Sequence, residues 1–203
     1  MGNRADITVR GASPQDAEAV SALLEASYPS LMAFGYEPTL FARALPLLTK
    51  ANPMLLSSCT WYVVEALDAE NRLVGCGGWA RQRPDVPNEP VDPVLGHIRH
   101  FATHPNWTRR GIGRALFDRC VADARAAGVC TFECYSSIGA EGFYRALGFS
   151  TVEPMKLALA ENLTIPGVRM LCEFARGAPE ARTTSGPVFI QDQSASGKRD
   201  SSA

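Results

Sequence analysis

The sequence feature that most constrains the fold is a strand that runs through a glycine-containing turn into a helix, over residues 97–115. Residues 97–103 are typical of a strand, and Gly111 and Gly113 stand where the chain turns into the helix. Backbone N–H groups at a helix start lack intrahelical acceptors, and the helix dipole is positive there. The stretch therefore predicts an anion-binding site.

Three arginines surround this turn. Arg109, Arg110 and Arg114 crowd a helix start, where cations are unfavourable unless an anion neutralises them. The pattern is not a dinucleotide-binding G-x-G-x-x-G, because Leu116 stands where the third glycine belongs. A Walker loop, G-x-x-x-x-G-K-[ST], is absent from the sequence. We therefore expect a phosphate-bearing ligand of another class.

Hydrophobic periodicity predicts strands and helices on both sides of this turn. Pro29 and Pro46 are expected to interrupt the helical patterns near the start of the chain. Besides residues 97–103, strands are predicted over residues 6–10, 60–67, 72–80, 129–135, 149–159 and 168–175, and later helices over residues 112–127 and 139–147.

The connections between these elements suggest how the strands pair. The strands over 60–67 and 72–80 read as a hairpin around a turn at 68–71, and Gly75, Gly77 and Gly78 predict a bulge or a close approach in the second strand. Strand, helix and strand over 97–135 form a βαβ unit, so its two strands are expected to be parallel. The last two strands are expected to pair around a turn at 162–167.

Composition limits the domain count and the classes of ligand. The chain has 203 residues, 46% of them hydrophobic, which suffices for one domain with a real core, placed here at residues 1–176. Residues 177–203 are rich in Ser, Gly and Pro, and we expect a disordered tail. The net charge of −1 gives no argument for nucleic acid or an anionic membrane as partner. Six cysteines without a C-x-x-C pair are typical of a reduced, cytoplasmic protein.

Three histidines lie close together in the sequence. Strand alternation predicts His97 on one face and His100 and His104 on the other. They would then not converge as metal ligands, and we expect no bound metal.

Two motifs resemble those of the GCN5-related N-acetyltransferases (GNAT). The run T-R-R-G-I-G over residues 108–113, which follows Pro105, is similar to motif A, [QR]-x-x-G-x-[GA]. The run A-E-G-F-Y-R-A-L-G-F over residues 140–149 is similar to motif B, A-x-x-F-Y-x-x-x-G-F. Two motifs in the family's order are far more specific than either alone, and the element order extends the resemblance to everything before the tail.

The resemblance implies a fold and an activity. The fold is mixed α/β, with a central, mostly antiparallel sheet, one parallel strand pair that splays at the CoA site, and helices on both faces. The activity is transfer of an acetyl group from acetyl-CoA to a primary amine, by direct transfer in a ternary complex and without a metal. We expect a small-molecule acceptor. The alternatives are a protein N-terminus or lysine as the acceptor, a longer acyl group as the group transferred, and a non-catalytic sensor that binds acyl-CoA. The last two strands could also pair between two copies of the chain and form a homodimer.

The resemblance also implies the residues that bind acetyl-CoA. Backbone N–H groups of the turn would bind the pyrophosphate, and the strand before it would pair with pantetheine and donate an N–H to the oxyanion. Thr108 stands where Gln or Arg is usual, so Arg109 or Arg110 is expected to compensate, and Ser137 stands where many members carry Asn. The expected binding residues are Phe101, Ala102, Thr103, Thr108, Arg109, Arg110, Gly111, Ile112, Gly113 and Arg114.

Two catalytic roles follow from the same resemblance. Tyr144 corresponds to the motif-B tyrosine that protonates the leaving thiolate. An alkylamine with a pKa near 10.4 is mostly protonated at pH 7, so a base is useful. His97 occupies the place where several members carry a glutamate base, and a histidine ordinarily titrates near 6.5. Glu65 and Glu133 are rival bases, and an intact acid and base argue against the sensor.

Overall fold

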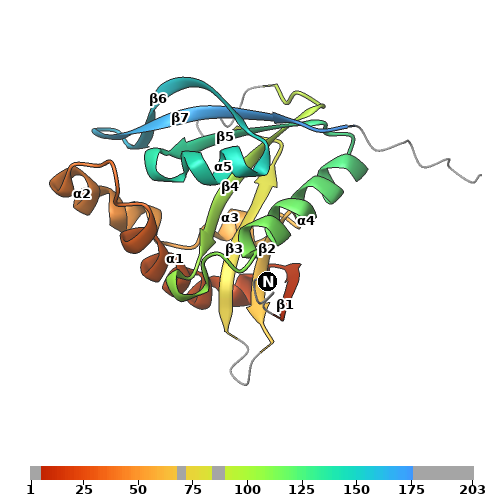
Figure 1. Ribbon diagram of the computed structural model, residues 1–203, viewed down its shortest axis with the longest axis horizontal. Coiled ribbons are helices and arrows are strands. Elements are labelled where there is room, and N and C mark those ends of the chain that lie inside the picture. The colour runs from red at the N-terminus through yellow and green to blue at the C-terminus, as the bar shows by residue number, and fades with distance from the viewer. Residues whose placement is uncertain (1–5, 68–71, 84–89, 176–203) are drawn as a thin grey trace, which may run out of the picture.

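The computed structural model describes residues 6–67, 72–83 and 90–175. The expected tail at 177–203 and the expected turn at 68–71 lie outside the described residues. Figure 1 shows one twisted sheet with helices packed on both of its faces. Among the described residues, no helix combines the length and the apolarity that crossing a membrane requires.

The strands agree closely with the hydrophobic pattern. All seven expected strands are present, with ends shifted by a few residues. They are β1 (Ile7–Gly11), β2 (Trp61–Ala66), β3 (Leu73–Ala80), β4 (Leu95–Thr103), β5 (Thr131–Ser137), β6 (Ser150–Ala160) and β7 (Leu163–Glu173).

The helices fall between these strands. The first half of the chain supplies η1 (Pro14–Asp16), α1 (Ala17–Leu31), α2 (Pro38–Leu48) and α3 (Pro53–Leu56). The second half supplies η2 (Pro105–Trp107), α4 (Ile112–Ala126), η3 (Ile138–Ala140) and α5 (Glu141–Leu147).

Three expectations about local structure are wrong. Helix α1 continues through Pro29 and α2 continues through Pro46. Burial of their apolar faces against the sheet outweighs the lost helical hydrogen bond. The last turn covers residues 161–162 rather than 162–167, because β7 begins at Leu163 and includes Pro166. Pro166 lies just beyond the last pair between β7 and β5, so its missing N–H costs no bond to β5.

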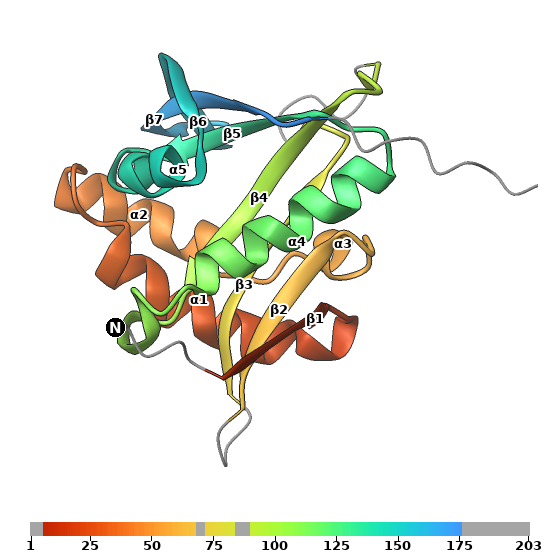
Figure 2. The same cartoon turned by 45° about the vertical axis from the view of Figure 1, so that its right-hand side comes forward.

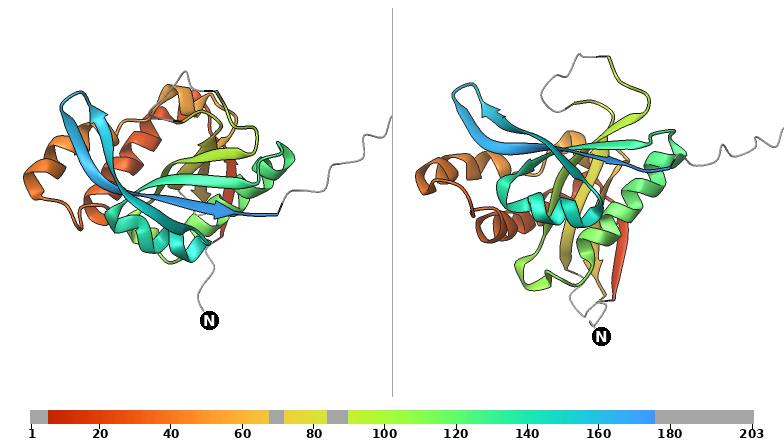
Figure 3. Two further views of the ribbon diagram at one scale, coloured as in Figure 1. Left: turned by 90° about the horizontal axis from the view of Figure 1, so that it is seen from above. Right: turned by 45° about the horizontal axis from the view of Figure 1, so that its top comes forward.

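Helices cover both faces of the sheet, whose strand order is β1-β2-β3-β4-β5-β7-β6. Figure 2 shows α4 lying across one face of the first four strands, with α1 on the other side. On the α4 face, Leu116 and Phe132 belong to a core with α5, while on the α1 face Val20 and Leu24 pack against Val63. The hairpin of β6 and β7 reaches over α2 (Figure 3), where Ile165 packs with Ala44.

The parallel pair expected from the βαβ unit is present and short. Strands β4 and β5 pair only at Leu95 with Thr131, Gly96 with Phe132, and His97 with Glu133. Beyond this point β5 continues along β7, while β4 continues along β3. The two strands therefore splay apart and, among the described residues, leave one edge of β4 without a neighbouring strand, as the family resemblance implies.

The glycines of β3 mark the expected bulge. The register between β3 and β4 shifts between Cys76 and Gly78, so that His100 and Phe101 lie opposite the single residue Gly77. A Cβ atom on Gly77 would lie 2.3 Å from Cδ1 of Phe101. Glycine is therefore required here, because only its bare backbone leaves room for the aromatic ring.

Replacing Gly78 by alanine should destabilise the sheet. The new Cβ would lie 2.4 Å from the carbonyl oxygen of Thr60 and 2.5 Å from Cα of Trp61, and backbone atoms cannot rotate away. We expect Gly78→Ala to lower the free energy of unfolding in urea by about 2–3 kcal/mol. Gly11→Ala is the control, because nothing lies within 4 Å of its Cβ position. Equal stability of the two variants would contradict this packing.

Candidate active site

A cavity of about 1070 Å³ lies where β4 and β5 separate. Side chains and backbone from α1, β4, the start of α4, β5, α5 and β6 line it. The residues expected from the sequence that line it are His97, Phe101, Ala102, Thr103, Thr108, Arg109, Gly111, Ile112, Gly113, Arg114 and Tyr144.

One end of the cavity is a helix start built for an anion. Arg109 has a φ of 63° and Gly111 a φ of 86°, so two residues of the turn are left-handed. Alternation of this kind turns successive N–H groups toward one point. No described side chain caps α4, and the N–H groups of Ile112, Gly113 and Arg114 occupy helical positions that have no intrahelical acceptor. The turn therefore offers a set of backbone donors to a group with several oxygen atoms.

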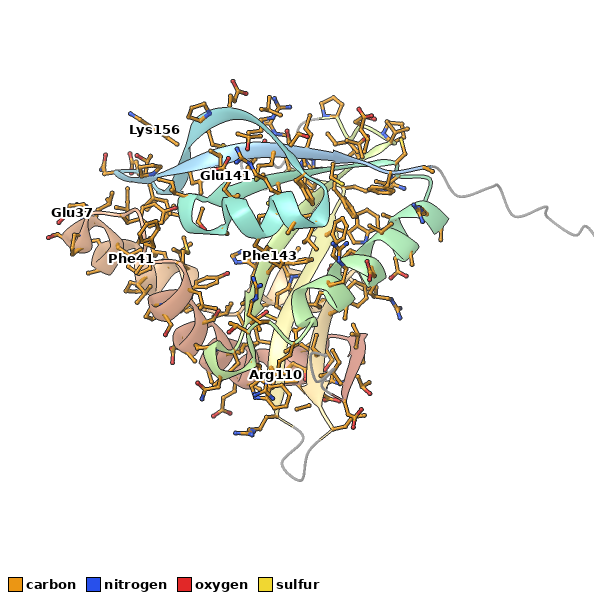
Figure 4. All side chains as sticks on the ribbon, viewed as in Figure 1. Glu37, Phe41, Arg110, Glu141, Phe143 and Lys156 are labelled. Atoms are coloured by element: carbon orange, nitrogen blue, oxygen red, sulfur yellow. The ribbon has the colours of Figure 1, made fainter. Side chains whose placement is uncertain are left out.

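Gly113 keeps this helix start close to α5. A Cβ atom there would lie 2.5 Å from the ring of Phe143. Figure 4 shows Phe143 on the side of α5 that faces α4. The glycine thus lets two helices meet at the edge of the cavity without blocking the donors.

The arginines of the turn have different roles. The Arg110 guanidinium lies over the Trp107 ring, 4.7 Å from its centroid, and Arg110, although expected among the binding residues, does not line the cavity. Its stacking partner Trp107, three residues earlier in the chain, draws the guanidinium aside. Arg114 donates to the carbonyl oxygen of Ala146 at 2.8 Å and so ties α4 to α5. Of the two residues expected to compensate for Thr108, only Arg109 lines the cavity.

A buried histidine and carboxylate meet where the two strands part. Nδ1 of His97 lies 3.0 Å from Oε2 of Glu133, and the Nε of Arg169 donates to Oε1 at 2.5 Å. Burial alone would raise the pKa of Glu133, but the hydrogen bonds from His97 and Arg169 lower it to about 2. The ionised carboxylate therefore accepts the Nδ1 proton and leaves Nε2 of His97 as the basic nitrogen.

The two other candidate bases, Glu65 and Glu133, are already hydrogen-bonded to other side chains. Glu65 lies on β2, accepts from the Nε of Arg10 at 2.8 Å, and does not line the cavity. Glu133 does line it, but both of its oxygens have cationic or N–H partners. His97 is consequently the candidate base with an available nitrogen.

The bulge in β4 overturns the expected orientation of the histidines. Ile98 packs in the core with α4, so His97 faces α1, and Nδ1 of His100 lies 3.4 Å from Oη of Tyr28 on α1. His100 is thus on the same face as His97, because one extra residue reverses the alternation. Burial lowers the pKa of His100 to about 4, with the charge of Arg99 acting in the same direction. Within the described residues, no group of three or more His, Cys, Asp or Glu side chains could hold a metal.

Tyr144 lies in the first turn of α5 and reaches the cavity from the opposite side of the sheet. Its side chain is buried and packs 6.3 Å from the Phe101 ring and 5.4 Å from the Phe149 ring, centroid to centroid. Burial, together with the neighbouring Cys134, raises its pKa well above the ordinary value. The hydroxyl is therefore protonated at neutral pH, and the Cys134 side chain lies within hydrogen-bond reach of it.

Tyr28 and His100 are cavity residues that the sequence did not reveal as a pair. They are separated by 72 residues in the chain and meet only because α1 packs beneath the bulge. The pairing of His97 with Glu133 had a signal, since both lie at corresponding positions of a predicted parallel strand pair.

Comparisons with known proteins agree with this architecture. The family model described as an acetyltransferase (GNAT) domain matches residues 57–151. No curated protein matches the sequence.

Several solved structures share the fold. A GCN5-related N-acetyltransferase from Rhodopseudomonas palustris has a TM-score of 0.64 at 18% identity, covering 86% of this chain and 99% of its own. The PaiA N-acetyltransferase from Thermoplasma acidophilum, in complex with coenzyme A, has a TM-score of 0.60 at 14% identity, covering 83% of this chain and 99% of its own. The ribosomal-protein-S18-alanine N-acetyltransferase from Escherichia coli has a TM-score of 0.52 at 15% identity, covering 86% of this chain and 97% of its own.

Proposed function

The chain belongs to the GCN5-related N-acetyltransferase family, and from this premise we propose that it transfers an acetyl group from acetyl-CoA to the primary amine of a small molecule. The transfer is direct, within a ternary complex. The observation that carries the proposal is one cavity that joins an uncapped helix start, an open strand edge, the buried His97–Glu133 pair and Tyr144. A cytoplasmic location is part of the proposal, since all six cysteines are free thiols.

The residues present fit acetyl-CoA. The donors at the start of α4 suit a pyrophosphate, and Arg109 adds charge beside them. The edge of β4 that β5 leaves after His97 suits the amide groups of a pantetheine arm, which pair as a strand would. Acetyl-CoA, when bound, supplies the activated thioester.

The bulge in β4 gives this chain a donor for the oxyanion. His100 has a φ of 50°, a conformation that costs a non-glycine residue on the order of 1–3 kcal/mol. The bulge re-aims the backbone between Phe101 and Thr103, which lines the cavity. An N–H from this segment stabilises negative charge on the carbonyl oxygen as the amine attacks.

His97 removes the proton from the acceptor amine. Glu133 fixes its Nδ1–H, and Arg169 in turn holds the Glu133 carboxylate, so the ring is oriented with Nε2 as the acceptor. Tyr144 donates its proton, or a hydrogen bond, to the departing thiolate. Its raised pKa keeps the hydroxyl protonated at neutral pH.

Removing the Tyr144 hydroxyl should slow turnover. We expect amine-dependent release of CoA thiol from acetyl-CoA in the wild type, and a kcat lowered about 100-fold in Tyr144→Phe with little change in the KM for acetyl-CoA. Tyr62→Phe is the matched control, because Tyr62 is a buried tyrosine on β2 that does not line the cavity. An unchanged kcat in Tyr144→Phe would remove this residue from the mechanism. Acetyl-CoA binding without turnover by any amine would favour a sensor.

Replacing His97 should change the pH dependence of the reaction. A base must be deprotonated to act, so kcat/KM of the wild type should fall on the acid side, and His97→Gln should lose this limb together with about 100-fold in rate. His104→Gln is the control, because His104 caps η2 and does not line the cavity. An acid limb that persists in His97→Gln would show that His97 is not the base.

A further inference from the structure

The cavity continues beyond the reaction site into a wall of aliphatic side chains. This wall consists of Leu31 and Leu47 from α1 and α2, and Leu157, Leu159 and Ile165 from the β6–β7 hairpin. Figure 3 shows the hairpin and the two helices facing each other across this part of the molecule. We propose that the wall binds an uncharged alkyl or aryl group attached to the acceptor amine, an inference that rests on the proposed function.

Strand alternation makes the hairpin side of the wall apolar. Along β6, Leu157 and Leu159 are half-buried, whereas Lys156 and Ala158 are exposed. Figure 4 shows Lys156 on the outer side of the hairpin, away from α2. Lys156 is the only charged residue among the described cavity-lining residues of α1, α2, β6 and β7, and it points away from the wall.

Hydrogen bonds and ring stacking fix the position of the helical side of the wall. The Tyr36 hydroxyl, from the segment between α1 and α2, donates to the carbonyl oxygen of Pro166 at 2.9 Å and accepts from the N–H of Ile138 at 3.2 Å. The Tyr36 ring stacks on Phe41 of α2, with centroids 5.7 Å apart. The segment between the two helices is therefore tied to both the hairpin and the end of β5.

The mouth of the wall leaves apolar surface exposed. Leu31 is 43% exposed and Leu47 is 51% exposed, although both line the cavity. Exposed apolar surface that continues into a cavity is typical of a site for an apolar ligand. Covering it would release water and favour binding.

The charges near the reaction site do not extend along the wall. Glu133 is balanced by His97 and Arg169, and His100 is neutral at pH 7 because burial lowers its pKa. Arg99 lines the cavity on β4 and has an interaction of its own. A second ammonium or a carboxylate on the acceptor would therefore lose water against the aliphatic wall without gaining a partner there.

A series of primary amines tests this inference. With purified enzyme and acetyl-CoA, kcat/KM should rise about fourfold per methylene from ethylamine to hexylamine. Hexane-1,6-diamine and 6-aminohexanoate, of the same length but charged at the far end, should be at least about tenfold poorer than hexylamine. Faster turnover of either charged amine, or of a peptide N-terminus, would overturn the inference and leave the proposed function standing. No turnover with any amine would overturn the proposed function itself.

A pair of surface variants assigns the effect to the wall. Leu47→Lys should lower the ratio of kcat/KM for hexylamine to that for ethylamine about tenfold, because it places a charge at the mouth. Met54→Lys is the matched control, since Met54 is 80% exposed and does not line the cavity, and the ratio should stay at the wild-type value. Both substituted positions are largely exposed, so both variants should fold. An unchanged ratio in Leu47→Lys would contradict the proposal.

Discussion

The early separation of β5 from β4 is the constraint on which the rest of this structure depends. The two strands pair over three residues each, and then β5 pairs antiparallel with β7 over its whole length. Beyond His97, β4 stays beside β3, and β5 stays beside β7, which pairs with the opposite edge of β5. The other edge of β4 therefore has no described strand beside it. The cavity, the exposed backbone of β4 and the meeting of His97 with Glu133 at the branch point all follow from this separation of the two strands.

Glycine positions and hydrophobic periodicity in the sequence were sufficient to predict the features that depend on local backbone conformation. The glycines of the turn predicted a helix start for an anion, and Gly111 is left-handed there. The glycines of β3 predicted a bulge, and it lies opposite Gly77. Alternation and helical periodicity predicted all seven strands and the helix α4, because side chains alternate between the two faces of a strand and repeat along one face of a helix.

Contacts between distant segments account for what the sequence did not reveal. Tertiary burial carries α1 and α2 past their prolines, and α3 was missed because four residues are too few to show a period. The glycines of β3 predicted an irregularity in β3, but the extra residue of the bulge lies on β4. It brings His100 to the same face of β4 as His97, where only His97 was expected. From the sequence, Glu133 was only a competing base. Its contacts with His97 and Arg169 instead make it the group that orients the His97 ring.

A crystal structure with coenzyme A bound would show directly whether the separated strands and the start of α4 form the binding site. We expect the pyrophosphate on the backbone N–H groups of residues 111–114 and the pantetheine amides paired with β4 between Ile98 and Thr103, with the sulfur between Tyr144 and the bulge. A pyrophosphate held away from the start of α4, or a pantetheine arm that does not contact the open edge of β4, would contradict it.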